Sequence, residues 1–204
     1  MTPHPIEIES YRLLDQRVDL SHLAPPVRAV VARVIHASAD TEYARTMVLD
    51  EPAVLAGVEA VRAGAPVVAD VEMVRHGITG AEAVCYLDEI AATPAAGPTR
   101  SARAMALAAR RHPTGVVLAV GCAPTALLEA VRMATEEEFM PALIVGLPVG
   151  FVGAADAKTA ARASGLPTIT NMGEHGGSAV AAAAVNAIIR LARAPGLGLG
   201  EDRG

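Results

Sequence analysis

The chain has 204 residues, of which 52% are hydrophobic, 19% are charged and 2% are aromatic, and its formal net charge is −5. Its length and apolar content predict one folded domain with a core of small side chains, and they argue against a second full domain. The negative charge and the scarcity of aromatic rings argue against a nucleic-acid-binding surface, which needs clustered lysine and arginine with stacking rings.

Cysteine usage and the first residues indicate the compartment. Cys85 and Cys122 stand far apart without CxxC spacing, so neither a zinc motif nor a disulfide framework is indicated. The first residues, MTPHPIEIE, include no apolar segment, and no run of 18 apolar residues could cross a bilayer. We therefore expect a cytoplasmic protein with neither a membrane nor a nucleic acid as partner.

The first half of the chain is predicted to begin its regular structure with a helix that carries His36. From Pro26 the apolar residues recur with helical spacing, so His36 falls in the last turn of a helix that ends near residues 37–40. The next expected elements are a helix over residues 51–63, a buried strand in the apolar run 65–74, and a strand over residues 83–87.

The second half alternates more regularly between the two patterns. Helices are expected over residues 99–111, 124–134, 153–164 and 177–194. Strands are expected over residues 115–121 and 166–171, and a strand followed by a loop over residues 141–150. This alternation predicts an α/β fold with a mainly parallel sheet and helices on both faces. We expect the single domain to span residues 1–194 and the glycine-rich residues 195–204 to be a disordered tail.

Three strand-to-helix junctions share a glycine-rich design: GCAPTA from Gly121, GLPVGFVGAA from Gly146 and GEHGGSA from Gly173. Backbone N–H groups and the helix dipole at such junctions favour anions, and in an open α/β sheet the junctions line the ligand crevice. Together they suggest a ligand with several negative groups, although any one glycine could serve only its turn. Neither the phosphate-loop motif nor the dinucleotide motif is present.

His36 is the residue best suited to move protons near neutral pH. On a helical wheel it points about 180° from the apolar stripe, beside Ala29, Ala32 and Arg33. That position suits either exposure to solvent, which periodicity alone favours, or a flat ligand lying against the helix. The other histidines are candidates at positions 76, 112 and 175 and expected surface residues at positions 4 and 22.

Four more polar residues have two interpretations each. Arg100 could hold a carboxylate through two hydrogen bonds or be a solvated first-turn charge. Ser10 could donate a hydrogen bond to a ligand or cap a helix that begins at Tyr11. Asp70 and Glu72 could do acid/base work at a strand end, although a role as loop caps is the favoured interpretation.

Seven segments carry a resemblance over nearly the whole chain, from about residue 6 to residue 193. They are IESYRLLD, RVIHASADTEYA, AGAPVVADVEMVRHGIT, TRSA, GCAPTALLE, ALIVGLPVGFVGAADAK and GGSAVAAAAVNA. In this order they resemble the precorrin-8X methylmutase family, called cobalt-precorrin-8 methylmutase in its metal-bearing branch. VGFVGAAxxK followed by GGSAxAAAAxNA is a specific pairing.

The resemblance implies a cofactor-free isomerase of cobalamin biosynthesis. It would move a methyl group from C11 to C12 of precorrin-8X, or of the cobalt form, to give hydrogenobyrinate or cobyrinate. The resemblance assigns the acid/base role to His36 and substrate contacts to Ser10 and Arg100, and it implies a homodimer with the substrate cleft close to the subunit interface. The expected substrate-binding set further comprises Thr99, Ser101, Thr125, Gly150, Gly153, Gly176 and Gly177.

A macrocycle fringed with acetate and propionate groups fits several helix N-termini despite the negative net charge, because local dipoles dominate at contact distance. The chain also departs from the family pattern. Glu174 and His175 stand where positive charge is common, Cys122 stands where asparagine is usual, and the stretch between residues 77 and 99 is short. These departures leave open a paralogue that binds a corrinoid or another tetrapyrrole without isomerising it.

Overall fold

Short runs of valine, leucine and isoleucine form the centre of the sheet. In the computed structural model, which describes residues 4–92 and 97–194, nearly every residue of these central runs is buried, as strands covered on both faces require. The strands of the described ranges are β1 (Met47–Val48), β2 (Val67–Ala69), β3 (Ala83–Cys85), β4 (Val117–Val120), β5 (Leu143–Gly146) and β6 (Thr168–Asn171). Their order is β1-β6-β5-β4-β2-β3.

Among the strands of the described residues, all neighbouring pairs except one are parallel. β1 runs antiparallel to β6 at the edge of the sheet, whereas β6, β5, β4, β2 and β3 are parallel to their neighbours. The prediction of an α/β fold with a mainly parallel sheet is therefore confirmed. The predicted tail over residues 195–204 lies outside the described residues.

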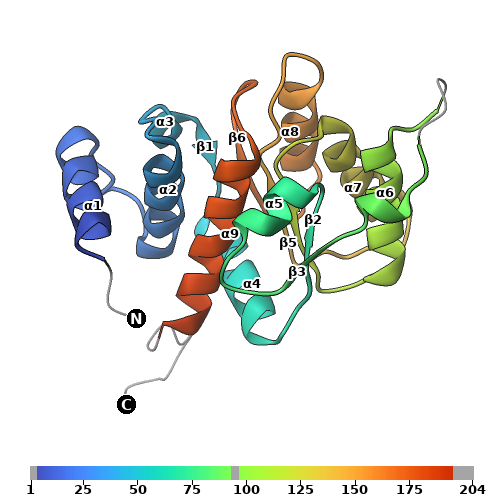
Figure 1. Cartoon of the computed structure of the whole chain (residues 1–204), viewed down its shortest axis with the longest axis horizontal. Helices are drawn as coiled ribbons and strands as arrows, with labels where there is room; N and C mark the ends of the chain where they lie inside the picture. The colour runs from blue at the N-terminus through green and yellow to red at the C-terminus, as the bar shows by residue number, and fades with distance from the viewer. Residues whose placement is uncertain (1–3, 93–96, 195–204) are drawn as a thin grey trace.

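Helices cover both faces of this sheet (Figure 1). One core lies between the sheet and the helices α2 (Pro25–Ser38), α4 (Glu51–Arg62), α5 (Glu72–Gly77) and α9 (Ser178–Arg193). A second core lies between the sheet and α6 (Arg100–Arg111), α7 (Pro124–Glu136) and α8 (Ala154–Ala163). The remaining elements are α1 (Pro5–Arg17), which packs on the outside of α2, and the short α3 (Tyr43–Thr46) and η1 (Leu87–Glu89).

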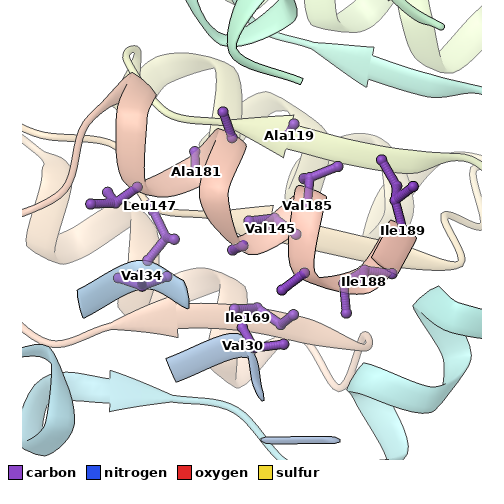
Figure 2. Packing of buried hydrophobic residues seen from close by; sticks show 14 of the residues in the cluster. Val30, Val34, Ala119, Val145, Leu147, Ile169, Ala181, Val185, Ile188 and Ile189 are labelled. Atoms are coloured by element: carbon purple, nitrogen blue, oxygen red, sulfur yellow. The ribbon is translucent and has the colours of Figure 1, made fainter. Parts of the chain in front are cut away.

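Small side chains allow α9 to lie close to the sheet. Figure 2 shows Ala181 and Val185 of α9 among the buried residues of strands β4 to β6 and of α2. A Cβ atom at Gly121 would stand 2.7 Å from the Ala181 Cβ, so the end of β4 also touches α9. The alanine-rich sequence of α9 is thus explained by close packing, as the scarcity of large rings leads one to expect.

Two predicted elements differ from the structure. The strand expected in residues 65–74 is limited to Val67–Ala69, because the chain turns after the buried Asp70 and forms α5 from Glu72. The helix expected to begin at Tyr11 instead begins at Pro5, where proline at the first position and Glu7 in the first turn favour a helix start. The interpretation of Ser10 as an N-cap is therefore wrong, and His4 is the N-cap.

Candidate functional site

The imidazole of His36 lies between α2 and α1. His36 occupies the last turn of α2, whose C-cap Ala39 adopts the left-handed conformation with φ of 55°. The His36 Nδ1 and Ser10 Oγ atoms are 2.8 Å apart and share a hydrogen bond. The Tyr11 ring stacks on the imidazole with a centroid separation of 4.9 Å and an interplanar angle of 8°. Ser10 and Tyr11 therefore hold the ring in one orientation.

Exposure to solvent, which periodicity favoured for His36, is not what the structure shows. The side chain points away from the sheet, as the helical wheel predicts, but α1 stands on that side and leaves His36 partly buried. The wheel of one helix contains no information about a second helix that packs against its polar face. Only the exposure of His36 was therefore predicted wrongly, because its contact with α1 depends on how two helices pack together.

The surroundings lower the pKa of His36. Burial is the largest cause, because it penalises the imidazolium cation, and the positive charge of Arg33 acts in the same direction. The carboxylate of Glu7 opposes both by favouring the cation. At neutral pH the unliganded site thus favours the neutral ring, which has one nitrogen able to accept a proton.

A cavity opens beside this ring, between α1 and the C-terminal end of α2, with a volume of about 490 Å³. Apolar side chains predominate in its lining, among them Ile6, Leu13, Leu14 and Ile35, and the polar groups include Ser10 and His36. A cavity of this size with a largely apolar wall and a few convergent polar groups is typical of a site for an organic ligand.

Two of the three glycine-rich junctions meet at the carboxyl edge of the sheet. The Gly177 N–H donates to the Leu147 carbonyl at 2.8 Å, and the Gly150 N–H donates to the Glu174 carbonyl at 3.1 Å. Gly153 and Gly177 are the N-caps of α8 and α9, and neither helix start has a side-chain cap. These two helix starts keep the dipoles and N–H groups that favour an anion.

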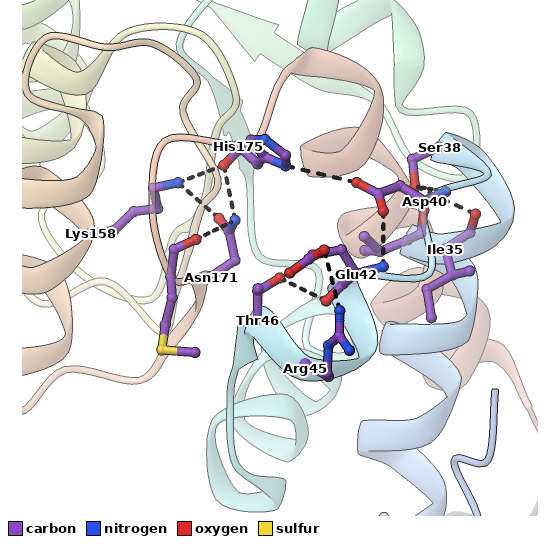
Figure 3. Close-up of polar contacts among 11 residues, drawn as sticks. Ile35, Ser38, Asp40, Glu42, Arg45, Thr46, Lys158, Asn171 and His175 are labelled. Carbon is purple, nitrogen blue, oxygen red and sulfur yellow. Dashed lines mark hydrogen bonds and ion pairs between the residues drawn. The ribbon is translucent and has the colours of Figure 1, made fainter.

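The buried Lys158 holds one of these loops from beneath. Its ammonium donates to Asn171 Oδ1 at 2.9 Å and to the His175 carbonyl at 2.6 Å (Figure 3). Burial lowers the pKa of Lys158 to about 8. Sequence reasoning missed this residue, although it lies on the helix face of the buried Ala154, Ala157 and Ala161, where a lysine is unusual.

The loop of residues 173–177 also reaches the segment that follows the helix of His36. The His175 ring nitrogen Nδ1 is 3.8 Å from Asp40 Oδ2, just beyond the end of α2 (Figure 3). The candidate His175 is therefore near the site, whereas His76 bonds within α5 and His112 bonds to Tyr86. His4 and His22 are exposed, as predicted.

The third junction, GCAPTA, is not an open anion site, and the prediction for it is corrected. The carboxylate of the buried Asp70 accepts hydrogen bonds from the N–H groups of Gly121, Cys122 and Ala123 at 3.1, 2.9 and 2.8 Å. Burial raises the pKa of Asp70, and the three backbone N–H groups oppose that rise. Asp70 is thus a loop cap, and an external anion would have to displace it.

The remaining candidates lie at the other end of the molecule. Arg100 begins α6, which stands opposite α1 and α2 in Figure 1. Its guanidinium donates to the Ile90 carbonyl at 3.0 Å and to Asp88 Oδ1 at 3.2 Å. Thr99 caps α6, and its hydroxyl is 2.7 Å from that of Thr125. One chain therefore does not bring these residues, or the partly exposed Ser101, next to His36.

The comparisons with known proteins agree with this fold along nearly the full chain. A solved structure described as precorrin-8x methyl mutase from Thermus thermophilus has a TM-score of 0.82 and 37% identity, and the match covers 92% of this chain and 95% of that chain. A cobalt-precorrin-8 methylmutase from Priestia megaterium is 38% identical over 93% of this chain and 88% of its own length. A precorrin-8X methylmutase from Sinorhizobium is 38% identical over 92% of each chain.

The fold and these relatives define the class of this protein as an α/β isomerase of cobalamin biosynthesis. The family model for precorrin-8X methylmutase matches residues 5–191, and the chain belongs to that family. The resemblance inferred from the sequence is confirmed. Among the described residues, no helix combines the length and apolar character that a membrane span needs.

Proposed function

We propose that this protein moves a methyl group from C11 to C12 of precorrin-8X or of its cobalt form, with His36 as the acid/base. The products would be hydrogenobyrinate and cobyrinate, respectively. The observation that carries the proposal is the imidazole of His36, held by Ser10 and Tyr11 at the wall of a largely apolar cavity of about 490 Å³. Such a wall suits the flat face of a macrocycle.

The reaction is balanced within the substrate, since one carbon–methyl bond breaks at C11 and one forms at C12. It needs protonation of the conjugated ring and return of that proton, and an imidazole can do both near neutral pH. With Nδ1 engaged by Ser10, Nε2 is the nitrogen that exchanges the proton with the substrate. His36 begins with a lowered pKa. A bound polycarboxylate brings negative charge, which raises that pKa and favours the protonated ring, the form that can act as an acid.

The carboxylates of the substrate need positive partners. The loops that contain Gly150, Gly153, Gly176 and Gly177 support this role, because α8 and α9 begin there without side-chain caps and the ammonium of Lys158 lies beneath. Helix N-termini and a nearby cation attract carboxylates without any need for a positive net charge. We place acetate or propionate groups of the macrocycle at these loops.

A homodimer would explain the candidates at the other end of the chain. In a dimer, the group comprising Thr99, Arg100, Ser101 and Thr125 would bind substrate beside His36 of the partner subunit. Arg100 supports this role because its acceptors among the described residues are one carbonyl and the largely exposed Asp88, which a substrate carboxylate could replace. We place this dimer in the cytoplasm.

Spectroscopy with each substrate tests the proposal. Precorrin-8X and cobalt-precorrin-8 are incubated separately with the wild-type protein and with His36→Ala, and the absorption spectrum is followed. We expect conversion by the wild type and binding with little or no conversion by His36→Ala. Tight binding of both substrates without conversion by the wild type would contradict the proposal.

A further inference from the structure

Glu7 joins three helices next to the His36 ring. Its Oε1 atom accepts a hydrogen bond from Arg33 Nη1 of α2 at 3.1 Å and from Arg190 Nη2 of α9 at 3.0 Å. The Glu7 side chain is 22% exposed and that of Arg33 is 24% exposed, so the Glu7–Arg33 pair is partly shielded from bulk water, whereas the Arg190 side chain is 60% exposed. Shielded, charge-assisted hydrogen bonds are stronger than those of free surface pairs.

The spacing of Glu7 puts it in line with the residues that touch His36. Glu7, Ser10, Tyr11 and Leu14 are separated by three, one and three residues, which places all four on one face of α1. Across from them, Arg33 and His36 are three residues apart on α2 and share a face of that helix. The Glu7–Arg33 pair therefore lies one turn from the Ser10–His36 hydrogen bond.

Apolar packing holds α1 only weakly. The structure describes the whole of α1, and Leu14 is its one buried residue. Tyr11 adds a partly buried ring, while Ile6 and Ile8 are 74% and 55% exposed. Since so little apolar area is buried, the polar contacts of Glu7 carry much of the task of keeping this helix in place.

We propose that Glu7 is a positioning residue for the reaction, whose carboxylate, held by Arg33 and Arg190, fixes α1 so that Ser10 and Tyr11 keep the His36 ring in its working orientation. This inference rests on the function proposed for His36. It gives Glu7 a role that acts through other side chains, since its carboxylate is bound to two guanidinium groups and not to the ring.

The charge of Glu7 has a second effect in the same place. Its carboxylate raises the pKa of His36, whereas Arg33 and Arg190 lower it. Replacing Glu7 by the neutral glutamine leaves the two cations without their common partner, and the pKa of His36 falls further. Aspartate keeps the charge on a shorter side chain, so Glu7→Asp separates loss of charge from loss of reach.

Imidazole NMR on the folded full-length protein provides the test. Wild type, Glu7→Gln and Glu7→Asp are labelled with ¹⁵N, and the His36 signals are assigned by their loss in His36→Gln. Glu59→Gln is the matched control, because Glu59 also pairs with an arginine but on α4. Turnover of precorrin-8X is measured on the same samples as a function of pH.

We expect Glu7→Gln to shift the tautomer signals of His36, to move its titration to lower pH and to reduce kcat at least about tenfold with little change in KM, as misplacement of a catalytic group does. Glu7→Asp should restore most of the titration, and Glu59→Gln should match the wild type. Unchanged His36 signals in Glu7→Gln would overturn the inference, whatever happens to the rate. If the wild type proves inactive, the ring signals still decide the role of Glu7, so the two proposals fail separately.

Discussion

Asp70→Ala should lower the free energy of unfolding. The change removes a carboxylate that accepts three backbone hydrogen bonds of 2.8 to 3.1 Å at the start of α7. A hydrogen bond to a charged group contributes about 1.5–3 kcal/mol, but water can reach the partly buried N–H groups of Cys122 and Ala123 after the change. We therefore expect a loss of about 3–5 kcal/mol of unfolding free energy.

Urea denaturation measures this loss, with Asp50→Ala as the matched control. Asp50 caps α4 through one bond to the Ala53 N–H at 2.8 Å, in an exposed position, so its removal should cost only about 1 kcal/mol. Sulfate or phosphate should stabilise Asp70→Ala more than the wild type, since the vacated N–H groups form an anion site. A loss below 1 kcal/mol, or equal stabilisation of both proteins by sulfate, would refute the assignment of Asp70 as the occupant of this junction.

Three further predictions concern a loop glycine, the buried Lys158 and the proposed dimer. Gly176→Ala should abolish turnover, and in urea titrations it should lower the unfolding free energy more than Gly173→Ala does. A Cβ atom at residue 176 would lie 2.3 Å from the Leu147 carbonyl oxygen, whereas at Gly173 only the positive φ would be strained. The pKa of Lys158 is lowered to about 8 from 10.5. Between these two pH values the folded state therefore binds fewer protons than the unfolded state. The unfolding free energy of the wild type relative to Lys158→Met should therefore rise by about 1–3 kcal/mol from pH 8 to pH 10.5, and a flat difference would contradict this. If subunits exchange at random and share sites, mixing inactive His36→Ala with inactive Arg100→Ala should restore up to about a quarter of the wild-type rate. No recovery of activity in a mixture shown to contain heterodimers would rule out the shared site.

Much of the fold could be predicted from periodicity. The apolar stripe that includes Val30 and Val34 located α2 to within a residue or two, and the run at residues 117–120 is a buried strand because it is apolar throughout. Such patterns report which face of an element meets the core. They are reliable for α2 and for the helices and strands of the second half, where the core face is wide.

The local structure of the site could not be predicted in the same way. Ser10 and His36 are in contact although they lie 26 positions apart in the sequence. Ser10 belongs to α1, in which only Leu14 is buried, so no apolar pattern predicts the contact. Asp70 contacts Gly121, 51 positions away in the sequence, because β2 and β4 are neighbours in the sheet. The sequence of neither segment predicts that order of strands. Contacts of this kind depend on topology and not on local spacing.

A crystal structure with bound hydrogenobyrinate would show whether His36 meets the reacting carbons of the substrate. We expect Nε2 of His36 to lie within hydrogen-bonding reach of the macrocycle beside C11 and C12, with the ring against the apolar wall of the cavity between α1 and α2. We also expect a carboxylate of the product at the N-termini of α8 and α9. A product bound with its C11–C12 edge away from His36 would show that His36 is not the acid/base.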